Sequence, residues 1–129
     1  CIEAGIPTLV EKPIATTVED GTRIARAADA HGVPLLVGHH RRHSPLLGAA
    51  RRVIDSGILG RLVAVTGAAM YRKPDAYFDE APWRRTAGGG PLLINLIHEI
   101  DTLRYLCGEI ASVQARGRIR PLGLFGVEK

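Results

Sequence analysis

The feature that most constrains the fold is a pair of short apolar runs separated by a helical pattern. Residues 8–10 (Thr-Leu-Val) and 33–37 (Val-Pro-Leu-Leu-Val) are apolar or β-branched, which is typical of strands buried on both faces. Between them, Thr17 precedes Glu19 and Asp20 as in a helix cap, and Gly32 follows the last apolar position. A strand, a helix and a strand over about thirty residues predict a βαβ unit with parallel strands.

Polar side chains follow both predicted strands. Glu11-Lys12-Pro13 comes after the first strand, and His39-His40-Arg41-Arg42 comes after the second. Parallel strands end at the same edge of a sheet, where open α/β sheets bind their ligands. Pro13 fixes its own φ and restricts Lys12, so the lysine lies on a stiff turn. A surface Glu-Lys pair at the end of a strand is the alternative interpretation.

The composition predicts one globular domain without a membrane span. The chain has 129 residues, a net charge of +4 and no apolar run long enough to cross a bilayer. Its 13 acidic residues are interspersed with the basic ones, which favours anionic small molecules such as cofactor phosphates over nucleic acid. Two cysteines cannot form a disulfide framework, and they indicate a reducing, cytoplasmic environment.

The second half of the chain mixes helical patterns with a long polar stretch. Ser44-Pro45 predicts a helix start, and residues 62–71 alternate as a strand does. Residues 72–90 are rich in Pro, Asp, Arg and Gly, and this composition indicates a loop of the kind that carries function. A helix is expected from Pro91 to Cys107, closed by Gly108, and residues 110–118 could begin another strand.

Three glycines and a histidine mark a second candidate stretch. Residues 88–90 are glycines immediately before the expected helix, where they allow a ligand to approach the backbone closely. At 100° per residue, Ile94, His98, Asp101 and Tyr105 fall on one strip beside the apolar face. Asp101 could therefore orient the His98 ring or hold its charge. A structural histidine at the margin of the core is the alternative.

Taken together, these motifs resemble one family. Glu-Lys-Pro after a strand, the His39–Arg42 run, the pair Trp83-Arg84, the three glycines, and a helix with His98 and Asp101 are similar to the glucose–fructose oxidoreductase/inositol dehydrogenase/MocA-like oxidoreductases. The resemblance implies an NAD- or NADP-dependent dehydrogenase that acts on a secondary alcohol of a sugar, cyclitol or related polyol. It also implies a cis Lys12–Pro13 bond.

The same resemblance implies roles for individual residues. Lys12 and His98 would be catalytic and would contact the substrate together with Asp101. The cofactor would be bound by Glu11, Lys12, Pro13, Arg42, Trp83 and Arg84. One departure is that the family's motif has an aspartate four residues before the histidine, and this chain has Ile94 there.

The resemblance also implies the domain organisation. Residues 1–43 would be the last βαβ part of a Rossmann domain, because no Gly-x-Gly-x-x-Gly lies upstream. Residues 44–129 would begin an α/β domain with an open, largely antiparallel sheet. We therefore expect an internal part of a longer, homo-oligomeric enzyme (dimer or tetramer), which is inactive as an isolated fragment.

Two alternatives belong to other functional classes. A catalytically inactive member could act as a binding or regulatory module, although Lys12 and His98 are both present. A metal site built from His39, His40, His43 and His98 is disfavoured, because adjacent histidines on a strand point to opposite faces. No metal is expected.

Overall fold

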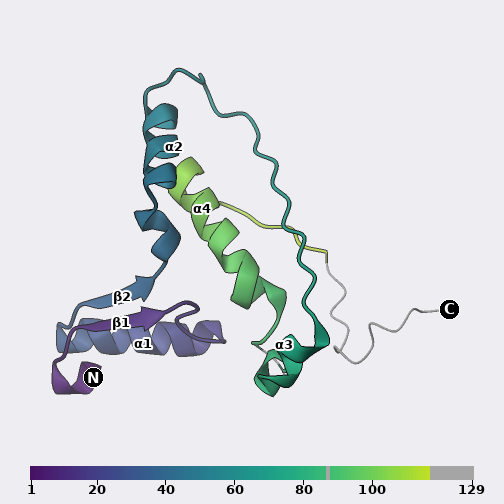
Figure 1. Ribbon diagram of the computed structural model, residues 1–129. Coiled ribbons are helices and arrows are strands. Elements are labelled where there is room, and N and C mark those ends of the chain that lie inside the picture. The colour runs from purple at the N-terminus through teal and green to yellow at the C-terminus, as the bar shows by residue number, and fades with distance from the viewer. Residues whose placement is uncertain (87, 117–129) are drawn as a thin grey trace.

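The computed structural model describes residues 1–86 and 88–116, and its first part is the predicted βαβ unit. Strands β1 (Thr8–Glu11) and β2 (Leu35–Gly38) pair in parallel, with Leu9 opposite Leu36 and Val10 opposite Val37. Helix α1 (Val18–His31) connects them and lies along the pair (Figure 1). A 3₁₀ turn, η1 (Ile2–Ala4), precedes β1.

The ends of α1 are where the sequence predicts them. The Thr17 hydroxyl accepts a hydrogen bond from the Asp20 backbone N–H at 3.1 Å, which satisfies one of the free amides of the first turn. Gly32 closes the helix with φ 61°, a left-handed conformation that favours glycine. Gly5 closes η1 in the same way with φ 71°.

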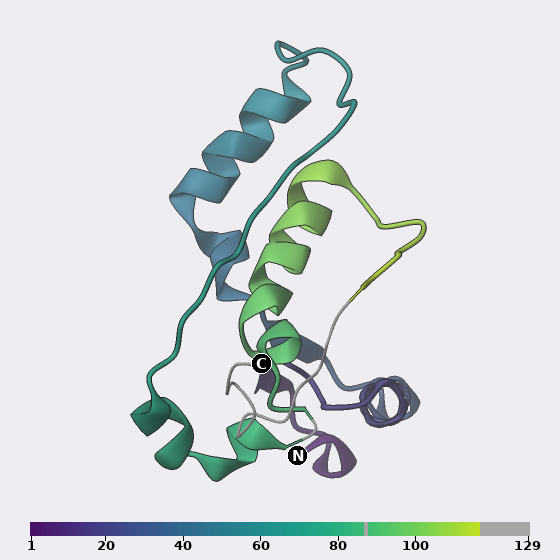
Figure 2. The same ribbon diagram turned by 90° about the vertical axis from the view of Figure 1, so that its right-hand side faces the viewer.

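The second part of the described chain is helical. Its elements are η2 (3₁₀, His40–His43), α2 (Pro45–Asp55), α3 (Asp75–Asp79), η3 (3₁₀, Pro82–Arg85), η4 (π-helical, Leu92–Leu96) and α4 (Ile97–Cys107). Helices α2 and α4 lie side by side, and the extended chain between α2 and α3 runs past them (Figures 1 and 2). Arg51 of α2 joins the two helices, because its Nη1 donates to the Tyr105 carbonyl at 2.6 Å.

The strand predicted over residues 62–71 is wrong. This segment is extended but has no strand assignment, and in the described part of the chain the sheet consists of β1 and β2 alone. An alternating sequence becomes a strand only when a neighbouring segment accepts and donates its backbone hydrogen bonds. Residues 110–116 also lack a strand, and the rest of that predicted segment lies outside the described residues.

The loop predicted over residues 72–90 contains short helical turns instead, namely α3 and η3. Contacts between side chains hold the two turns together. The Arg84 guanidinium lies 3.8 Å from the centroid of the Tyr77 ring, and Arg85 Nη2 lies 2.7 Å from Asp79 Oδ1. Cation–π contacts of this kind have no periodic signature, so composition alone indicated a loop.

The helix predicted from Pro91 is correct in extent but not uniform. Residues 92–96 form a π-helical turn, and the regular helix begins at Ile97. A π turn has more residues per turn than an α-helix. The predicted strip therefore holds for His98, Asp101 and Tyr105, but Ile94 does not follow the α-helical spacing.

Burial is uneven across the described part of the chain. Ala28 and Val33 are the buried apolar residues, with 3% and 8% of their surface exposed, whereas Leu9 and Leu36 are 69% and 62% exposed. Val10 and Leu35 are half-buried, and β1 alternates between half-buried and exposed residues. Among the described residues the strands are therefore covered on one face, not on both as their apolar sequences predict. Within the same residues, no helix has the length and apolar character needed to cross a membrane.

Candidate functional site

Lys12 lies at the carboxyl edge of β1 and reaches the helix that carries His98. The Lys12–Pro13 peptide bond is cis, as predicted. Lys12 Nζ donates a hydrogen bond of 2.7 Å to the carbonyl oxygen of Ile94, 82 positions further along the chain. Ile94 belongs to the π-helical turn immediately before α4. The lysine is therefore held against the turn that precedes His98.

His98 lies in a positively charged, partly buried environment. Its ring packs edge to face against the ring of His40, with centroids 4.9 Å apart. Its Nδ1 atom is buried and has no hydrogen-bond partner among the described residues. Burial lowers the pKa of His98 below 6.5, and the charges of Lys12, Arg41 and His40 lower it further, while Glu99 acts in the opposite direction. The neutral imidazole is therefore favoured.

Asp101 faces Arg42 and not His98. Arg42 Nε donates to both carboxylate oxygens at 3.1 and 2.9 Å, and its Nη2 donates to Oδ1 at 2.6 Å. His39 Nδ1 lies 3.6 Å from Oδ2, too far for a hydrogen bond. Asp101 is only 4% exposed. The expectation that Asp101 orients the His98 ring is therefore wrong, because its carboxylate accepts hydrogen bonds from Arg42 of η2.

The ion pair decides the protonation of Asp101. Burial works to raise the pKa of its carboxyl group, but the Arg42 hydrogen bonds and the charges of His39, Arg42 and Arg104 outweigh burial. The pKa of Asp101 is therefore held below its ordinary value. The Arg42 guanidinium also lies 5.7 Å from the centroid of the Tyr105 ring. Arg42, predicted to contact the cofactor, connects η2 to α4.

A second ion pair, next to the first, was not predicted. Arg41 Nη1 donates to Glu99 Oε1 at 2.8 Å, and the Tyr71 hydroxyl donates to the same oxygen at 3.0 Å. The Arg41 hydrogen bond is the largest cause of a lowered Glu99 pKa, with burial opposing it and Tyr71 assisting. The adjacent arginines in the sequence were a signal for two such pairs. Their partners, however, are 58 and 59 positions away.

Glycines allow close contacts at both ends of this site. A Cβ atom on Gly38 would lie 3.1 Å from Glu11 Oε1, so the Glu11 carboxylate lies close to the end of β2. A Cβ atom on Gly89 would lie 2.5 Å from the Trp83 carbonyl oxygen, and one on Gly88 would lie 2.7 Å from Thr16. The glycine segment is thus packed between η3 and the loop that follows Lys12 and Pro13.

Trp83 and Arg84, also predicted to bind the cofactor, lie in η3. Trp83 is 55% exposed, while Arg84 donates to the Tyr77 carbonyl and stacks on the Tyr77 ring. Arg84 therefore has protein partners, and the indole of Trp83 is accessible.

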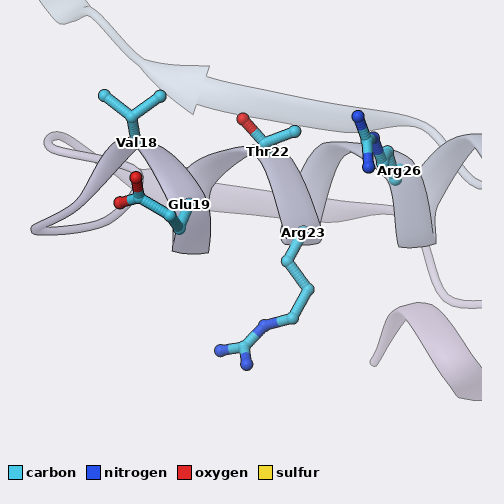
Figure 3. Close-up of a pocket in the computed structure, with 5 residues that line it drawn as sticks. All are labelled: Val18, Glu19, Thr22, Arg23 and Arg26. Carbon is cyan, nitrogen blue, oxygen red and sulfur yellow. The ribbon is translucent and has the colours of Figure 1, made fainter.

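Two other features do not belong to this site. A depression on α1 is lined by five residues of that helix, and none of them is a predicted site residue (Figure 3): Val18, Glu19, Thr22, Arg23 and Arg26. Across residues 1–86 and 88–116, no three His, Cys, Asp or Glu side chains are grouped to hold a metal ion. His40 and His43 lie in the 3₁₀ turn η2 and not on a strand, so the strand geometry used to disfavour a histidine metal site does not apply to them.

Comparison with known proteins identifies the family. Residues 1–39 match the model of an oxidoreductase family with an NAD-binding Rossmann fold, and residues 47–128 match the GFO/IDH/MocA C-terminal domain. The chain belongs to the GFO/IDH/MocA oxidoreductase family. The first match contains β1, α1 and β2, and the second contains α4 with His98.

Similar proteins include a protein of rhizopine catabolism and a reductase of an anhydro-sugar. The chain is 35% identical over 108 residues to the rhizopine catabolism protein MocA of Rhizobium meliloti, covering 81% of this chain and 32% of that protein. It is 36% identical over 132 residues to 1,5-anhydro-D-fructose reductase of Ensifer adhaerens, covering 98% of this chain and 38% of that protein. The chain thus spans about a third of the length of these relatives.

A solved structure shows the same arrangement. The WlbA dehydrogenase from Bordetella pertussis, determined in complex with NADH and UDP-GlcNAcA, superposes with a TM-score of 0.77 at 35% sequence identity. The superposition covers 83% of this chain and 33% of that protein. The α/β fold of this chain, with its parallel strand pair, is therefore a Rossmann-type oxidoreductase fold.

Proposed function

We propose that this chain is part of an NAD- or NADP-dependent dehydrogenase that transfers a hydride between the nicotinamide and a secondary alcohol of a sugar, cyclitol or related polyol. The observation that carries the proposal is the hydrogen bond of 2.7 Å from Lys12 to the Ile94 carbonyl. It holds a lysine from the end of β1 beside the histidine of α4, so that two groups able to exchange protons share one site.

Lys12 is proposed to transfer the proton of the substrate hydroxyl. Its ammonium group has three donors, and one is used by the Ile94 carbonyl. A second can therefore be directed at a substrate oxygen. When the alcohol is oxidised, a proton leaves that oxygen and the neutral form of Lys12 accepts it; in the reverse direction the ammonium returns it. No carboxylate of the described residues forms an ion pair with Lys12.

His98 is proposed to contact the substrate beside the reacting carbon. Because Nδ1 is buried, the neutral imidazole would offer its other nitrogen, Nε2, to one substrate hydroxyl, as a donor or an acceptor according to its tautomer. The lowered pKa of His98, caused by burial and then by Lys12, Arg41 and His40, keeps the ring in that form at neutral pH. Asp101, expected to bind substrate, is better placed to fix the position of α4 through Arg42.

The residues at the strand ends fit a dinucleotide. The Glu11 carboxylate lies at the carboxyl edge of the parallel pair, beside Gly38, where it can accept hydrogen bonds from ribose hydroxyls. Pro13 and the exposed indole of Trp83 offer apolar surfaces. Glu11, Lys12, Pro13 and Trp83 would therefore hold the cofactor, which supplies or accepts the hydride. Arg42 and Arg84 already have protein partners.

The proposal extends to the organisation of the protein. The proposed boundary between the nucleotide-binding part (1–43) and the substrate domain (44–129) lies directly after η2. An open, largely antiparallel sheet in the complete protein is also proposed, and it would cover the apolar side chains of residues 62–65 that are exposed here. Free cysteines at positions 1 and 107 are consistent with a reducing, cytoplasmic location. A homo-oligomer of two or four subunits is also proposed.

The experiment uses the complete protein of which this chain is part. NAD or NADP reduction is measured with a panel of cyclitols, anhydro-sugars and nucleotide-linked sugar acids. We expect turnover with at least one member of the panel. Binding of NADH, seen by nicotinamide fluorescence, without turnover of any polyol would instead support an inactive binding or regulatory member.

A further inference from the structure

The four residues that begin at His39 face the four that begin at His98. His40 packs against His98, Arg41 pairs with Glu99, and Arg42 pairs with Asp101. The ring contact between His40 and His98 is therefore followed, in both segments, by two ion pairs that hold η2 against α4.

The Glu99 pair differs from the Asp101 pair. Asp101 is buried and bound by one arginine, whereas Glu99 has a side chain that is 35% exposed and accepts from two donors of different segments, Arg41 of η2 and Tyr71 of the extended chain. Its second oxygen, Oε2, is buried and has no partner among the described residues. The charge of Glu99 also raises the pKa of His98, against the effects of burial and of the positive groups.

We propose that Glu99, held by Arg41 and Tyr71, is a positioning residue for His98. Its carboxylate fixes α4 on η2, so that the His98 ring stays against the His40 ring. It also supplies negative charge in a site where Lys12, Arg41 and His40 supply positive charge. The proposal deepens the proposed function and rests on it for the role of His98.

The charged groups around His98 predict the direction in which each substitution changes its pKa. Lys12 faces it from the loop after β1, His40 and Arg41 face it from η2, Glu99 lies beside it on α4, and the Tyr71 hydroxyl reaches Glu99 from the extended segment. Removing the Glu99 charge leaves Arg41 uncompensated, so the His98 pKa falls further. Removing the Arg41 charge has the opposite effect. A purely structural ion pair would give both variants the same outcome.

The test is an NMR titration of His98 in the complete protein, labelled at histidine Cε1, with the signal identified by its absence in His98→Asn. We expect the His98 midpoint to fall in Glu99→Gln, to rise in Arg41→Met, and to return towards the wild-type value in the double variant. Glu109→Gln is the matched control. That residue pairs with Arg104 through two hydrogen bonds of 2.9 Å just after α4, with a side chain that is 78% exposed.

Kinetics provide the second readout. Glu99→Gln should lower kcat/KM by about 10- to 100-fold and shift its pH profile, with NADH affinity unchanged, because a small displacement of a positioned group is enough. An unchanged or raised His98 midpoint in Glu99→Gln, or the same shift in Arg41→Met, overturns the proposal. If Glu99→Gln does not fold, the direction of the Arg41→Met shift decides. The NMR titration does not need turnover, so failure of the proposed dehydrogenase activity is seen separately, in the wild-type assay.

Discussion

Lys12 and His98 come together from two regions that hold their side chains in different ways. Lys12 follows a four-residue strand and is held by a single backbone carbonyl, that of Ile94. His98 sits in the first turn of α4, surrounded by the side chains of Lys12, His40, Arg41 and Glu99, with no hydrogen bond of its own among the described residues. One group is placed by the backbone and the other by charged and aromatic neighbours.

This difference predicts which substitutions affect Lys12 and which affect His98. A backbone carbonyl is present whatever side chain the residue carries, so the contact of Lys12 does not depend on the isoleucine side chain at position 94. The surroundings of His98 depend on several side chains, and the protonation of its ring responds to each of them. Replacing Lys12 itself should therefore act mainly on chemistry, whereas replacing the charged neighbours of His98 should change the protonation of its ring.

The largest effect is expected from Lys12→Met in the complete enzyme. Loss of the proton-transfer group should lower turnover by roughly 10²–10⁴-fold. NADH should still bind, which a fluorescence titration would show. A variant that keeps more than about a third of wild-type turnover would remove Lys12 from the proposed chemistry.

His98→Asn should have a smaller effect on activity than Lys12→Met. The asparagine can still form one hydrogen bond to a substrate hydroxyl, so we expect kcat/KM to fall by about 10²-fold. The free energy of unfolding should change little, since the His98 ring has no hydrogen bond to lose among the described residues. Normal kinetics with lowered stability would make His98 a structural residue.

Asp101→Asn tests the support of the His98 region. Arg42 donates three hydrogen bonds to the Asp101 carboxylate, and an amide at this position removes the negative charge that accepts them. We therefore expect the free energy of unfolding to fall by about 1.5–3 kcal/mol. The control is Glu109→Gln, whose carboxylate pairs with Arg104 just after α4 and whose side chain is 78% exposed, so little change is expected there. Chemical denaturation of the complete protein measures both. Equal effects of the two substitutions would show that burial of Asp101 does not matter.

Gly89→Ala tests the support of the Lys12 region, because the glycines lead into the π turn that carries the Ile94 carbonyl. The added methyl group would lie 2.5 Å from the Trp83 carbonyl oxygen and 2.6 Å from the Arg84 Cα atom, so the backbone must move. We expect a loss of about 1–3 kcal/mol. Gly90→Ala is the matched control, since nothing lies within 4 Å of its Cβ position. A Gly89→Ala protein as stable as Gly90→Ala would contradict this packing.

The smallest effect is on the pH dependence of stability. The pKa of His98 is lowered by burial and then by Lys12, Arg41 and His40, so the unfolded chain binds this proton before the folded protein does. Stability is therefore complete above the ordinary value of 6.5 and falls as the pH drops from there towards the folded pKa. His98→Asn should lose less stability than wild type in that window. Thermal melts at several pH values measure this difference. The same decrease of Tm with falling pH in both proteins would contradict the prediction.

The sequence alone determined the first third of the chain. The βαβ unit was predictable because it depends on local signals: two apolar runs, the Thr17 cap and Gly32 in a left-handed conformation. Lys12 and His98 became candidate site residues through their place after a strand and after three glycines, and through the family resemblance. These signals are read within a few residues, so a linear sequence contains them.

Only the tertiary structure decided what surrounds those two residues. The partners of Lys12, Arg41 and Arg42 are 82, 58 and 59 positions away, and no periodicity links such distant positions. The π turn at residues 92–96, whose Ile94 carbonyl accepts a hydrogen bond from Lys12, and the unpaired backbone of residues 62–71 within the described chain are further features that the sequence did not predict. A helical pattern does not show an added residue in one turn, and an alternating pattern needs a neighbouring strand to become one. Local propensity therefore placed the elements, while pairing between distant side chains placed the site.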